Sequence, residues 1–363
     1  MSRINVVKLF SAIILTFGAH RLSATVTYAV GTCKPKMASF ATISDALAAT
    51  PAPNVVMVCP GTYNEQVVIT QAVNLEGVAT GDAGQAIIAV PSGGLVTNVL
   101  NDNGIPVAAQ IAVTTATGPV SLSDITVDAA GNGVGDGTVV GVFYQNSPGT
   151  IDRVTTRNQV VGTGPTGIGM WIEGGGSNPS VVVENSSIHD FGGTGIHVEG
   201  NSETSELTAT LKSNYIYSTS ENATAGIVLE LGTTSTVTSN FVAVSSGGAT
   251  GISVQSGASG SVSGNTLTNN VIGIDIQGDG VSISGNKIFG NTLYGIQVLT
   301  SVALVKGNTI TGGPVGIEFA CYANPNVMSN IITDAATGTD QVPSGVSTSN
   351  SYFDVGSLRT GGC

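Results

Sequence analysis

The chain has 363 residues, of which 50 are Gly, and only 9% are charged and 5% are aromatic. Few aromatic and many small residues favour one thin, repetitive domain over several globular ones. The formal net charge of −12 favours solubility and disfavours binding to nucleic acid, to membrane surfaces and, unless a cation intervenes, to acidic polysaccharides. We expect a monomer.

Residues 1–24 have the features of a secretory signal. Arg3 lies in the positively charged start, Leu9 to Ala19 is apolar, and Ser23-Ala24 offers a small-residue cleavage site. Cleavage there would remove three of the 11 basic residues and no acidic one, leaving a net charge of 8 − 23 = −15. The apolar segment is short for a membrane span, and a retained anchor is the alternative. We expect an extracellular or periplasmic protein.

After this signal the first predicted elements are a strand and a helix. Thr25–Val30 predicts a strand, and Ser39 can cap a helix whose apolar face holds Phe40, Ile43 and Leu47. We expect the helix to cover the open end of a core. Further strands are predicted, in chain order, at Val55–Val58, Gln66–Ile69, Val73–Leu75, Ala86–Val90, Ala109–Val113, Val120–Val127 and Val139–Tyr144.

The rest of the chain repeats two short phrases, and late in the sequence the period is 21 to 22 residues. The first phrase is a Gly followed by Ile or Val, at Gly141, Gly167, Gly195, Gly226, Gly251, Gly273, Gly295 and Gly316. The second is an Asn, usually preceded by a small residue, at Asn185, Asn214, Asn240, Asn265, Asn286, Asn308 and Asn330. Repeats of this length indicate a solenoid.

Alternating apolar residues within each repeat, such as Ile274-Asp275-Ile276, predict strands that stack in parallel on the next repeat. We therefore predict an all-β fold, a single-stranded right-handed parallel β-helix with an N-terminal helical cap. Each Asn is expected to adopt the positive φ of a corner and to join a hydrogen-bonded ladder, and each Gly to serve the other corner. The expected boundaries are a signal at 1–24, cap and first coils at 25–77, β-helix at 78–335 and a C-terminal cap at 336–363.

A family resemblance lies in the N-terminal part. Phe40-Ala41-Thr42-Ile43-Ser44-Asp45-Ala46 resembles a Phe-x-Thr-Ile-x-x-Ala opening, and the segments 60–65, 67–69 and 75–77 resemble the phrases that follow it in many β-helix proteins. With the repeats, the chain resembles the pectin lyase-like superfamily, including NosD-type proteins with PbH1 repeats, over most of residues 28–335. This resemblance implies the fold. The superfamily holds lyases, hydrolases, esterases and epimerases, and also members without known activity.

Catalytic signatures of that superfamily are missing from the sequence. The chain lacks the Gly-x-Val-Asp-Phe-Ile-Phe-Gly phrase of pectin methylesterases and the Asp-Asp and Gly-His-Gly phrases of polygalacturonases. It also has no convincing nucleophile elbow and no metalloprotease His pair. No catalytic residue can therefore be transferred from a family.

Four cysteines in an exported chain predict disulfides. Three pairings are possible, and proximity in sequence favours Cys33 with Cys59 and Cys321 with Cys363, one at each end of the solenoid. A metal site formed by these cysteines is a weak alternative, because they lack the spacing of metal ligands. No metal site is predicted.

If the Ile of each Gly-Ile points inward, two rows of side chains point outward. The first row would hold Phe143, Gly169, His197, Val228, Ser253, Asp275, Gln297 and Glu318. The second would hold Gln145, Trp171, Glu199, Glu230, Gln255, Gln277, Leu299 and Ala320. Neighbouring rungs are about 4.8 Å apart. We thus expect Trp171 to be an exposed platform for a sugar, with His197, Glu199, Glu230 and Glu173 beside it.

Two functions remain open on this basis, and whether the protein is an enzyme is left open too. It is either a protein that binds carbohydrate or another surface partner along this face, or a polysaccharide-processing hydrolase or lyase in which Glu199, Glu230 and His197 are the candidate catalytic residues. The alternative for the two carboxylates is a solvated outer face.

Other polar groups are candidates for a role in a lyase reaction. His189-Asp190 could act as acid or base, or form a local turn pair. A uronate substrate would need cations, for which Arg153 and Arg157 are candidates. No cofactor is expected, although calcium bound by carboxylates, Asp124, Asp128 or Asp136, could take the place of those cations.

Overall fold

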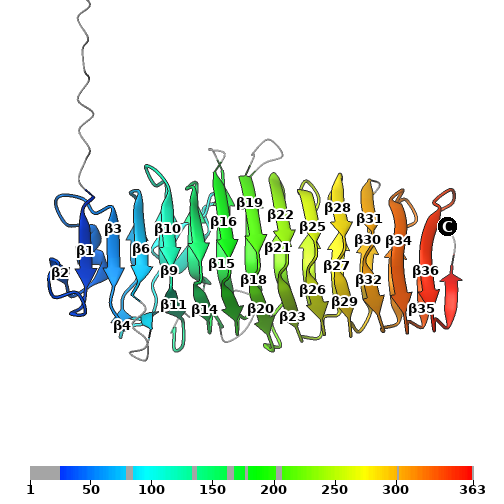
Figure 1. Ribbon diagram of the computed structural model, residues 1–363, viewed down its shortest axis with the longest axis horizontal. Helices are drawn as coiled ribbons and strands as arrows, with labels where there is room; N and C mark the ends of the chain where they lie inside the picture. Colours follow the sequence, from blue (N-terminus) through cyan, green and yellow to red (C-terminus); the bar gives the residue numbers. More distant parts are fainter. Residues whose placement is uncertain are drawn as a thin grey trace, which may run out of the picture.

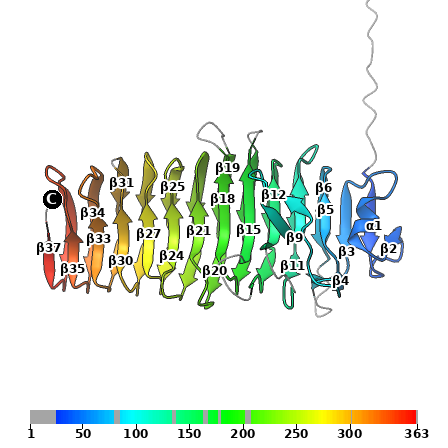
Figure 2. The same cartoon turned by 180° about the vertical axis from the view of Figure 1, so that it is seen from behind.

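A computed structural model describes residues 25–78, 85–132, 137–161, 167–175, 179–201, 207–300 and 302–361. The chain winds into an elongated stack of coils, with its first strands at one end and its last strands at the other (Figure 1). Seen from behind, a second face of parallel strands runs along the whole stack (Figure 2). The predicted signal lies outside the described residues. No helix in the described part of the chain has the length and hydropathy of a membrane span.

Each coil contributes strands to three parallel ladders. The first ladder contains β1 (Thr27–Val30), β3 (Val55–Val58), β6 (Val73–Gly77), β10 (Val120–Ser123), β13 (Gly149–Asp152), β16 (Ser180–Glu184), β19 (Leu207–Lys212), β22 (Thr233–Thr238), β25 (Ser259–Ser263), β28 (Val281–Ser284), β31 (Ala303–Lys306), β34 (Asn326–Thr333) and β36 (Thr348–Phe353). The short β2 (Ser39–Phe40) pairs with β1.

The second ladder follows the first after a sharp corner. It contains β4 (Gly61–Asn64), β7 (Ala86–Ala89), β11 (Ile125–Asp128), β14 (Thr155–Arg157), β17 (Ser187–His189), β20 (Tyr215–Ser218), β23 (Phe241–Val244), β26 (Thr266–Thr268), β29 (Lys287–Phe289) and β32 (Thr309–Thr311), which pairs with the second half of β34.

The third ladder is a separate sheet and carries the candidate site. It contains β5 (Val67–Ile69), β9 (Pro106–Thr114), β12 (Thr138–Gln145), β15 (Gly167–Gly174), β18 (Thr194–Gly200), β21 (Ala225–Leu229), β24 (Thr250–Val254), β27 (Ile272–Ile276), β30 (Tyr294–Val298), β33 (Val315–Phe319), β35 (Thr337–Asp340) and β37 (Ser357–Thr360). At its edge β8 (Val99–Leu100) pairs with β9 and is antiparallel.

These ladders confirm the predicted parallel β-helix, with one exception in the strands and one at the N-terminus. The segment predicted as one strand, Val120–Val127, is two strands that meet at Asp124, where φ is 56°. The predicted helical cap is wrong. The only helix in the described residues, α1 (Ile43–Leu47), has five residues and is capped by Thr42, because Ser39 and Phe40 pair with β1 instead.

The core is a stack of aliphatic side chains along the axis of the solenoid. The Ile of each regular Gly-Ile phrase points inward and is fully buried, in register from coil to coil: Ile196, Ile227, Ile252, Ile274, Ile296 and Ile317. Because successive residues of a strand point to opposite faces, the residue after each of these Ile residues points outward. The repeat thereby determines which side chains form the outer rows.

The predicted Asn ladder is confirmed, although its corner geometry differs from the prediction. Side-chain amides bond from coil to coil at 2.9–3.0 Å through Asn214, Asn240, Asn265, Asn286, Asn308, Asn330 and Asn350. From Asn214 to Asn330, the positive φ belongs to the residue before each Asn, for example 58° at Ser239 and 64° at Gly264. Asn185 itself has a φ of 51°, and Ser186 takes its place beside Asn214. The Asn is therefore selected for its amide rather than for its backbone.

The expectation that Gly serves the other corner is also wrong. Gly251 lies inside β24, and a Cβ there would be 2.6 Å from the carbonyl oxygen of Gly273 and 2.8 Å from Leu267 Cδ2. Gly195 meets the same two obstacles, the oxygen of Gly226 and a second-ladder side chain. Because the third-ladder strands pass so close to neighbouring atoms at these positions, only Gly, which has no Cβ, leaves enough space.

A Gly251→Ala variant is expected to be destabilised by about 1–3 kcal/mol, because the added methyl group meets a backbone oxygen that cannot move aside. Gly247→Ala is the matched control, since nothing lies within 4 Å of a Cβ at Gly247. Urea denaturation of both variants measures the difference. Equal stability of the two variants would contradict the close approach.

One predicted disulfide is confirmed, between Cys33 and Cys59. It links the segment after β1 to the end of β3, at the N-terminal end of the stack. The second predicted pair involves Cys363, which lies outside the described residues, and it stays a prediction.

Candidate functional site

At one coil, that of β15, the outward rows of the third ladder have a different register from the one expected. Trp171 of β15 pairs with His197 of β18, and Glu173 pairs with Glu199. The predicted position of Trp171 in the row of Glu199 is therefore wrong by two residues. The reason is that Gly169, and not Gly167, is equivalent to Gly195 of the next coil, since a Cβ on Gly169 would lie 2.7 Å from the Gly195 oxygen.

Trp171 is buried, and the expectation of an exposed sugar platform is wrong. Its side chain is 5% exposed and packs in a small apolar cluster that β8 joins through Val99. The indole lies edge-on to the Phe143 ring at 5.3 Å and stacks on the His197 imidazole at 5.3 Å with an interplanar angle of 6°. Trp171 therefore supports His197 from the neighbouring rung and holds the imidazole in place.

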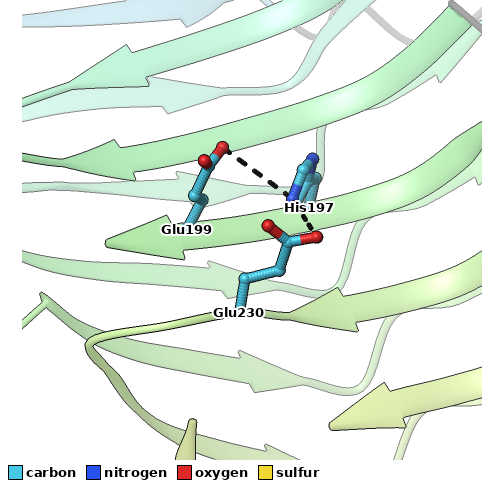
Figure 3. Close-up of side chains that lie close together, drawn as sticks. All are labelled: His197, Glu199 and Glu230. Atoms are coloured by element: carbon cyan, nitrogen blue, oxygen red, sulfur yellow. Dashed lines mark ion pairs between the residues drawn. The ribbon is translucent and has the colours of Figure 1, made fainter. Parts of the chain in front are cut away.

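His197, Glu199 and Glu230 form a compact cluster (Figure 3). His197 Nε2 lies 3.3 Å from Glu230 Oε1 and 4.0 Å from Glu199 Oε2. One ligand atom from each of the three residues lies within 4.8 Å of the other two. The side chains are 16%, 15% and 28% exposed for His197, Glu199 and Glu230, so all three are partly desolvated while remaining accessible from outside.

The surroundings displace the pKa values of the two glutamates in opposite directions. Burial raises the pKa of Glu199 above its ordinary value of 4.5, and the negative charge of Glu230 adds to the effect, although the charge of His197 opposes it. Contact with the His197 ring lowers the pKa of Glu230, against the effect of burial. Glu199 therefore tends to keep its proton while Glu230 tends to lose its own, which is the arrangement that acid–base chemistry uses.

A second carboxyl pair lies behind this cluster. Glu173 is 1% exposed, and its Oε1 accepts a hydrogen bond from the backbone N–H of Asp102 at 3.0 Å. Burial raises the pKa of Glu173 to about 8, and the charges of Asp102 and Glu199 act in the same direction. Gln145 donates to both carboxyl groups, at 2.9 Å to Asp102 and 3.2 Å to Glu173. Glu173 was expected beside an exposed platform, but it is buried and stabilises the segment above it.

Asp102 and its neighbour Asn103 were missed by the sequence analysis. They follow β8 in an irregular segment without the repeat, so nothing in the sequence indicated that this segment lies against β15 and β18. Asn103 Nδ2 is 3.4 Å from Glu199 Oε1, and Gln145 also donates to the Leu100 carbonyl oxygen. The segment therefore forms one wall of the candidate site.

The same three side chains could hold a divalent cation, a possibility that the sequence did not indicate. Their ligand atoms come within 4.8 Å of one another. One imidazole nitrogen and two carboxylates suit Zn²⁺ or Mn²⁺ better than Ca²⁺, which prefers six to eight oxygen ligands. The calcium ligands suggested by the sequence lie elsewhere: Asp124 and Asp128 are paired with Arg153 and Arg157 at 2.8 Å, and Asp136 lies outside the described residues.

The remaining sequence candidates do not join the site. His189 lies on β17 of the second ladder, where its Nδ1 is 2.6 Å from Asp190 Oδ2 and its ring stacks on Tyr217 at 4.9 Å. Arg153 and Arg157 lie near the ends of β13 and β14, on the first two ladders. The cations that a lyase would use against a uronate are thus not brought to the cluster.

Comparisons with known proteins identify the fold of this chain. Residues 195–355 match the family model of the right-handed beta helix region. No curated protein matches the sequence. The catalytic domain of a GH87 α-1,3-glucanase, solved with tetrasaccharides, is 16% identical with a TM-score of 0.59, and the match covers 94% of this chain and 67% of that one.

Two further structures are similar at lower scores. The periplasmic alginate epimerase AlgG is 12% identical with a TM-score of 0.50, and the match covers 84% of this chain and 73% of that chain. The Dettilon tailspike protein is 14% identical with the same score, and the match covers 82% and 61%. At such identities these matches define the architecture alone: this chain has a right-handed parallel β-helix fold, which carbohydrate-active enzymes and tailspikes share.

Proposed function

We propose that this protein is a polysaccharide hydrolase whose catalytic pair is Glu199 and Glu230. The observation that carries the proposal is the placement of these two carboxyl groups on adjacent rungs, with their pKa values displaced in opposite directions and the His197 ring beside both. Their closest approach, within 4.8 Å, is nearer to the separation of about 5–5.5 Å in retaining glycosidases than to the 6.5–9.5 Å of inverting ones.

In this mechanism Glu199 is the general acid and Glu230 the nucleophile. Glu230 attacks the anomeric carbon while Glu199 gives its proton to the departing glycosidic oxygen, so that the C–O bond breaks and a glycosyl ester forms. Glu199, now ionised, then takes a proton from water, which attacks the ester and releases Glu230. His197 orients the Glu230 carboxylate, and the stack with Trp171 holds that imidazole in place.

Sugar release from a panel of polysaccharides tests the proposal. Neutral, cationic and anionic polymers are incubated with the wild-type protein and with the Glu199→Gln, Glu230→Gln double variant, and new reducing ends are measured. Release by the wild type that is lost in the double variant supports the hydrolase. If no polymer is cleaved, or if the double variant retains the activity, the proposal fails. A chelator in a parallel arm separates acid–base catalysis, which it leaves unchanged, from catalysis by a bound metal ion.

The pH profile of this activity is expected to be bell-shaped. Activity falls on the acid side as Glu230 becomes protonated below 4.5, and on the alkaline side as Glu199 loses its proton above 4.5, because their pKa values lie on either side of that ordinary value. Initial rates measured across the pH range check this. In Glu199→Gln the residual activity should lose its alkaline limb, and an unchanged profile would contradict the assignment.

Glycan binding without cleavage is the second candidate. It is favoured by the continuity of the third ladder, whose outward rows run in register from β12 to β35 and offer an extended surface to a polymer. Retardation of the wild-type protein in gels that contain each polysaccharide measures this binding. Binding by a wild type that cleaves nothing would favour this candidate over the hydrolase.

Export of the protein is part of the same proposal. The Cys33–Cys59 disulfide suggests folding outside the reducing cytoplasm, and the proposed signal at residues 1–24 would direct the chain there. The mass of the protein recovered from the periplasm or medium tests cleavage after Ala24.

A further inference from the structure

Carboxylates are concentrated on the outward rows of the third ladder. Register pairs join Ser253 to Asp275, Gln297 to Glu318 and Glu318 to Asp340, so this acidic face continues well beyond the candidate catalytic pair. We define the acidic face by its carboxylates from β15 to β35: Glu173, Glu199, Glu230, Asp275, Glu318 and Asp340.

No Lys or Arg lies on the strands of the third ladder from β15 to β35. The basic residues outside the signal number 11 − 3 = 8, and all of them lie in the described part of the chain. They are found before β2, at the first and second ladders or in β37: Lys34, Lys36, Arg153, Arg157, Lys212, Lys287, Lys306 and Arg359. His197 is therefore the one side chain on the described acidic face that can become a cation.

Two carboxylates of the acidic face are buried and incompletely paired. Asp275 is 7% exposed and Glu318 is 5% exposed. Asp275 Oδ1 and Glu318 Oε2 have no hydrogen-bond partner among the described residues. Burial raises the pKa of both groups, and the charge of Asp340 adds to the effect at Glu318. An unpaired buried carboxyl group costs free energy unless a ligand supplies the missing partner.

The negative charge of the acidic face favours some classes of glycan over others. A polyuronate would bring its own carboxylates against an acidic surface and be repelled. A neutral glycan would offer hydroxyl groups but no countercharge for Asp275 and Glu318. Protonated amino groups would supply both a charge and hydrogen-bond donors, and hydrogen bonds between charged partners are roughly twice as strong as neutral ones.

We propose that the ligand of the acidic face is a cationic polysaccharide, a polymer of amino sugars with free amino groups. This proposal names the substrate class of the proposed hydrolase and rests on that function only in taking a glycan as the ligand. The amino groups would lie along the rungs that carry Asp275, Glu318 and Asp340, which leads the chain toward Glu230 and Glu199.

The experiment compares two oligomers with one backbone: glucosamine oligomers and their N-acetylated, neutral counterparts. Affinities are measured by calorimetry at several pH values from acidic to neutral, in low and high salt. The glucosamine oligomer is expected to bind at least about tenfold more tightly, and salt should weaken its binding. Glu318→Gln and Asp275→Asn should each weaken it by about tenfold. Glu184→Gln, the same change on β16 of the first ladder, should leave it unaltered.

Equal affinity for the two oligomers, or no loss in Glu318→Gln and Asp275→Asn, would overturn the proposal. Its failure can be told apart from failure of the hydrolase. Cleavage of a neutral polymer that disappears in Glu230→Gln, together with equal affinities, would retain the hydrolase and reject the cationic substrate. Tight binding of the glucosamine oligomer by a protein that cleaves no polymer would retain the cationic ligand and reject the hydrolase.

Discussion

Replacing Glu230 with Gln is expected to lower the rate of polysaccharide cleavage by about 10³- to 10⁴-fold. The amide keeps the size of the side chain but removes the negative charge that attacks the anomeric carbon. Because His197 lies 3.3 Å from Glu230 Oε1, the variant can keep that contact, so the fold should be retained. Reducing-end assays on a polymer that the wild type cleaves measure the loss.

Glu199→Gln should cause a loss of similar size on natural polymers, yet the two variants can be distinguished. Without its acid the enzyme can still form the glycosyl ester from an aryl glycoside whose leaving group needs no proton. Glu199→Gln should therefore recover the rate of this first step on that substrate, although hydrolysis of the ester still lacks Glu199 as its base. Glu230→Gln should not recover, because the nucleophile is missing. Recovery by Glu230→Gln alone would reverse the two roles.

Glu184→Gln is the matched control for both variants. It makes the same chemical change on β16, in the first ladder, and should leave activity unchanged. Circular dichroism and thermal melting must show that all three variants fold like the wild type. If the control loses as much activity as Glu199→Gln, the losses reflect damage to the fold and the catalytic assignment fails.

Replacing Asn286 with Ala is expected to destabilise the protein by about 3–5 kcal/mol. Asn286 Nδ2 donates to the Val262 carbonyl oxygen at 3.0 Å and to Asn308 Oδ1 at 2.9 Å, and its Oδ1 accepts from the backbone and side chain of Asn265 at 2.9 and 3.0 Å. All of these partners are buried, and each group left without a partner costs about 1–3 kcal/mol. Urea denaturation, followed by tryptophan fluorescence and circular dichroism, measures the change.

Asn222→Ala provides the comparison, since Asn222 is exposed in the turn before β21 and its variant should be within about 0.5 kcal/mol of the wild type. In a solenoid each coil contacts only its neighbours, so the Asn286 variant should lose structure first around its own coil. Hydrogen exchange can locate that loss. A variant as stable as the control would mean that the amide ladder does not stabilise the stack.

Much of the fold could be predicted because the repeat acts locally and periodically. Alternation in segments such as Ile274–Ile276 determines which residues face the core. Equivalent residues then stack on one another, so the same positions face the core in each coil. The Asn ladder was predicted because stacking brings like residues together, and the Cys33–Cys59 disulfide was predicted from proximity in sequence. The placement of Glu230 on the rung next to Glu199 followed as well, whereas the neighbour predicted on the other side, Trp171, was wrong.

Other features depend on geometry that no local pattern encodes. The sequence could not show that a Gly Cβ would meet the next coil's oxygen, nor that the residue before the Asn, such as Ser239, adopts the positive φ. The short helix α1 replaces the expected cap because Ser39 and Phe40 pair with β1. In each case a contact between coils outweighs a local preference.

By itself, the sequence determined the solenoid, its inward and outward faces and the acidic residues available on the outside. Only the tertiary structure decided the character of the candidate site. The irregular segment after β8 lies over β15, buries Trp171 and Glu173, and brings Asp102 and Asn103 to the cluster. That segment has no repeat, so its position depends on long-range contacts. The burial that follows from those contacts raises the pKa of Glu173 and Glu199.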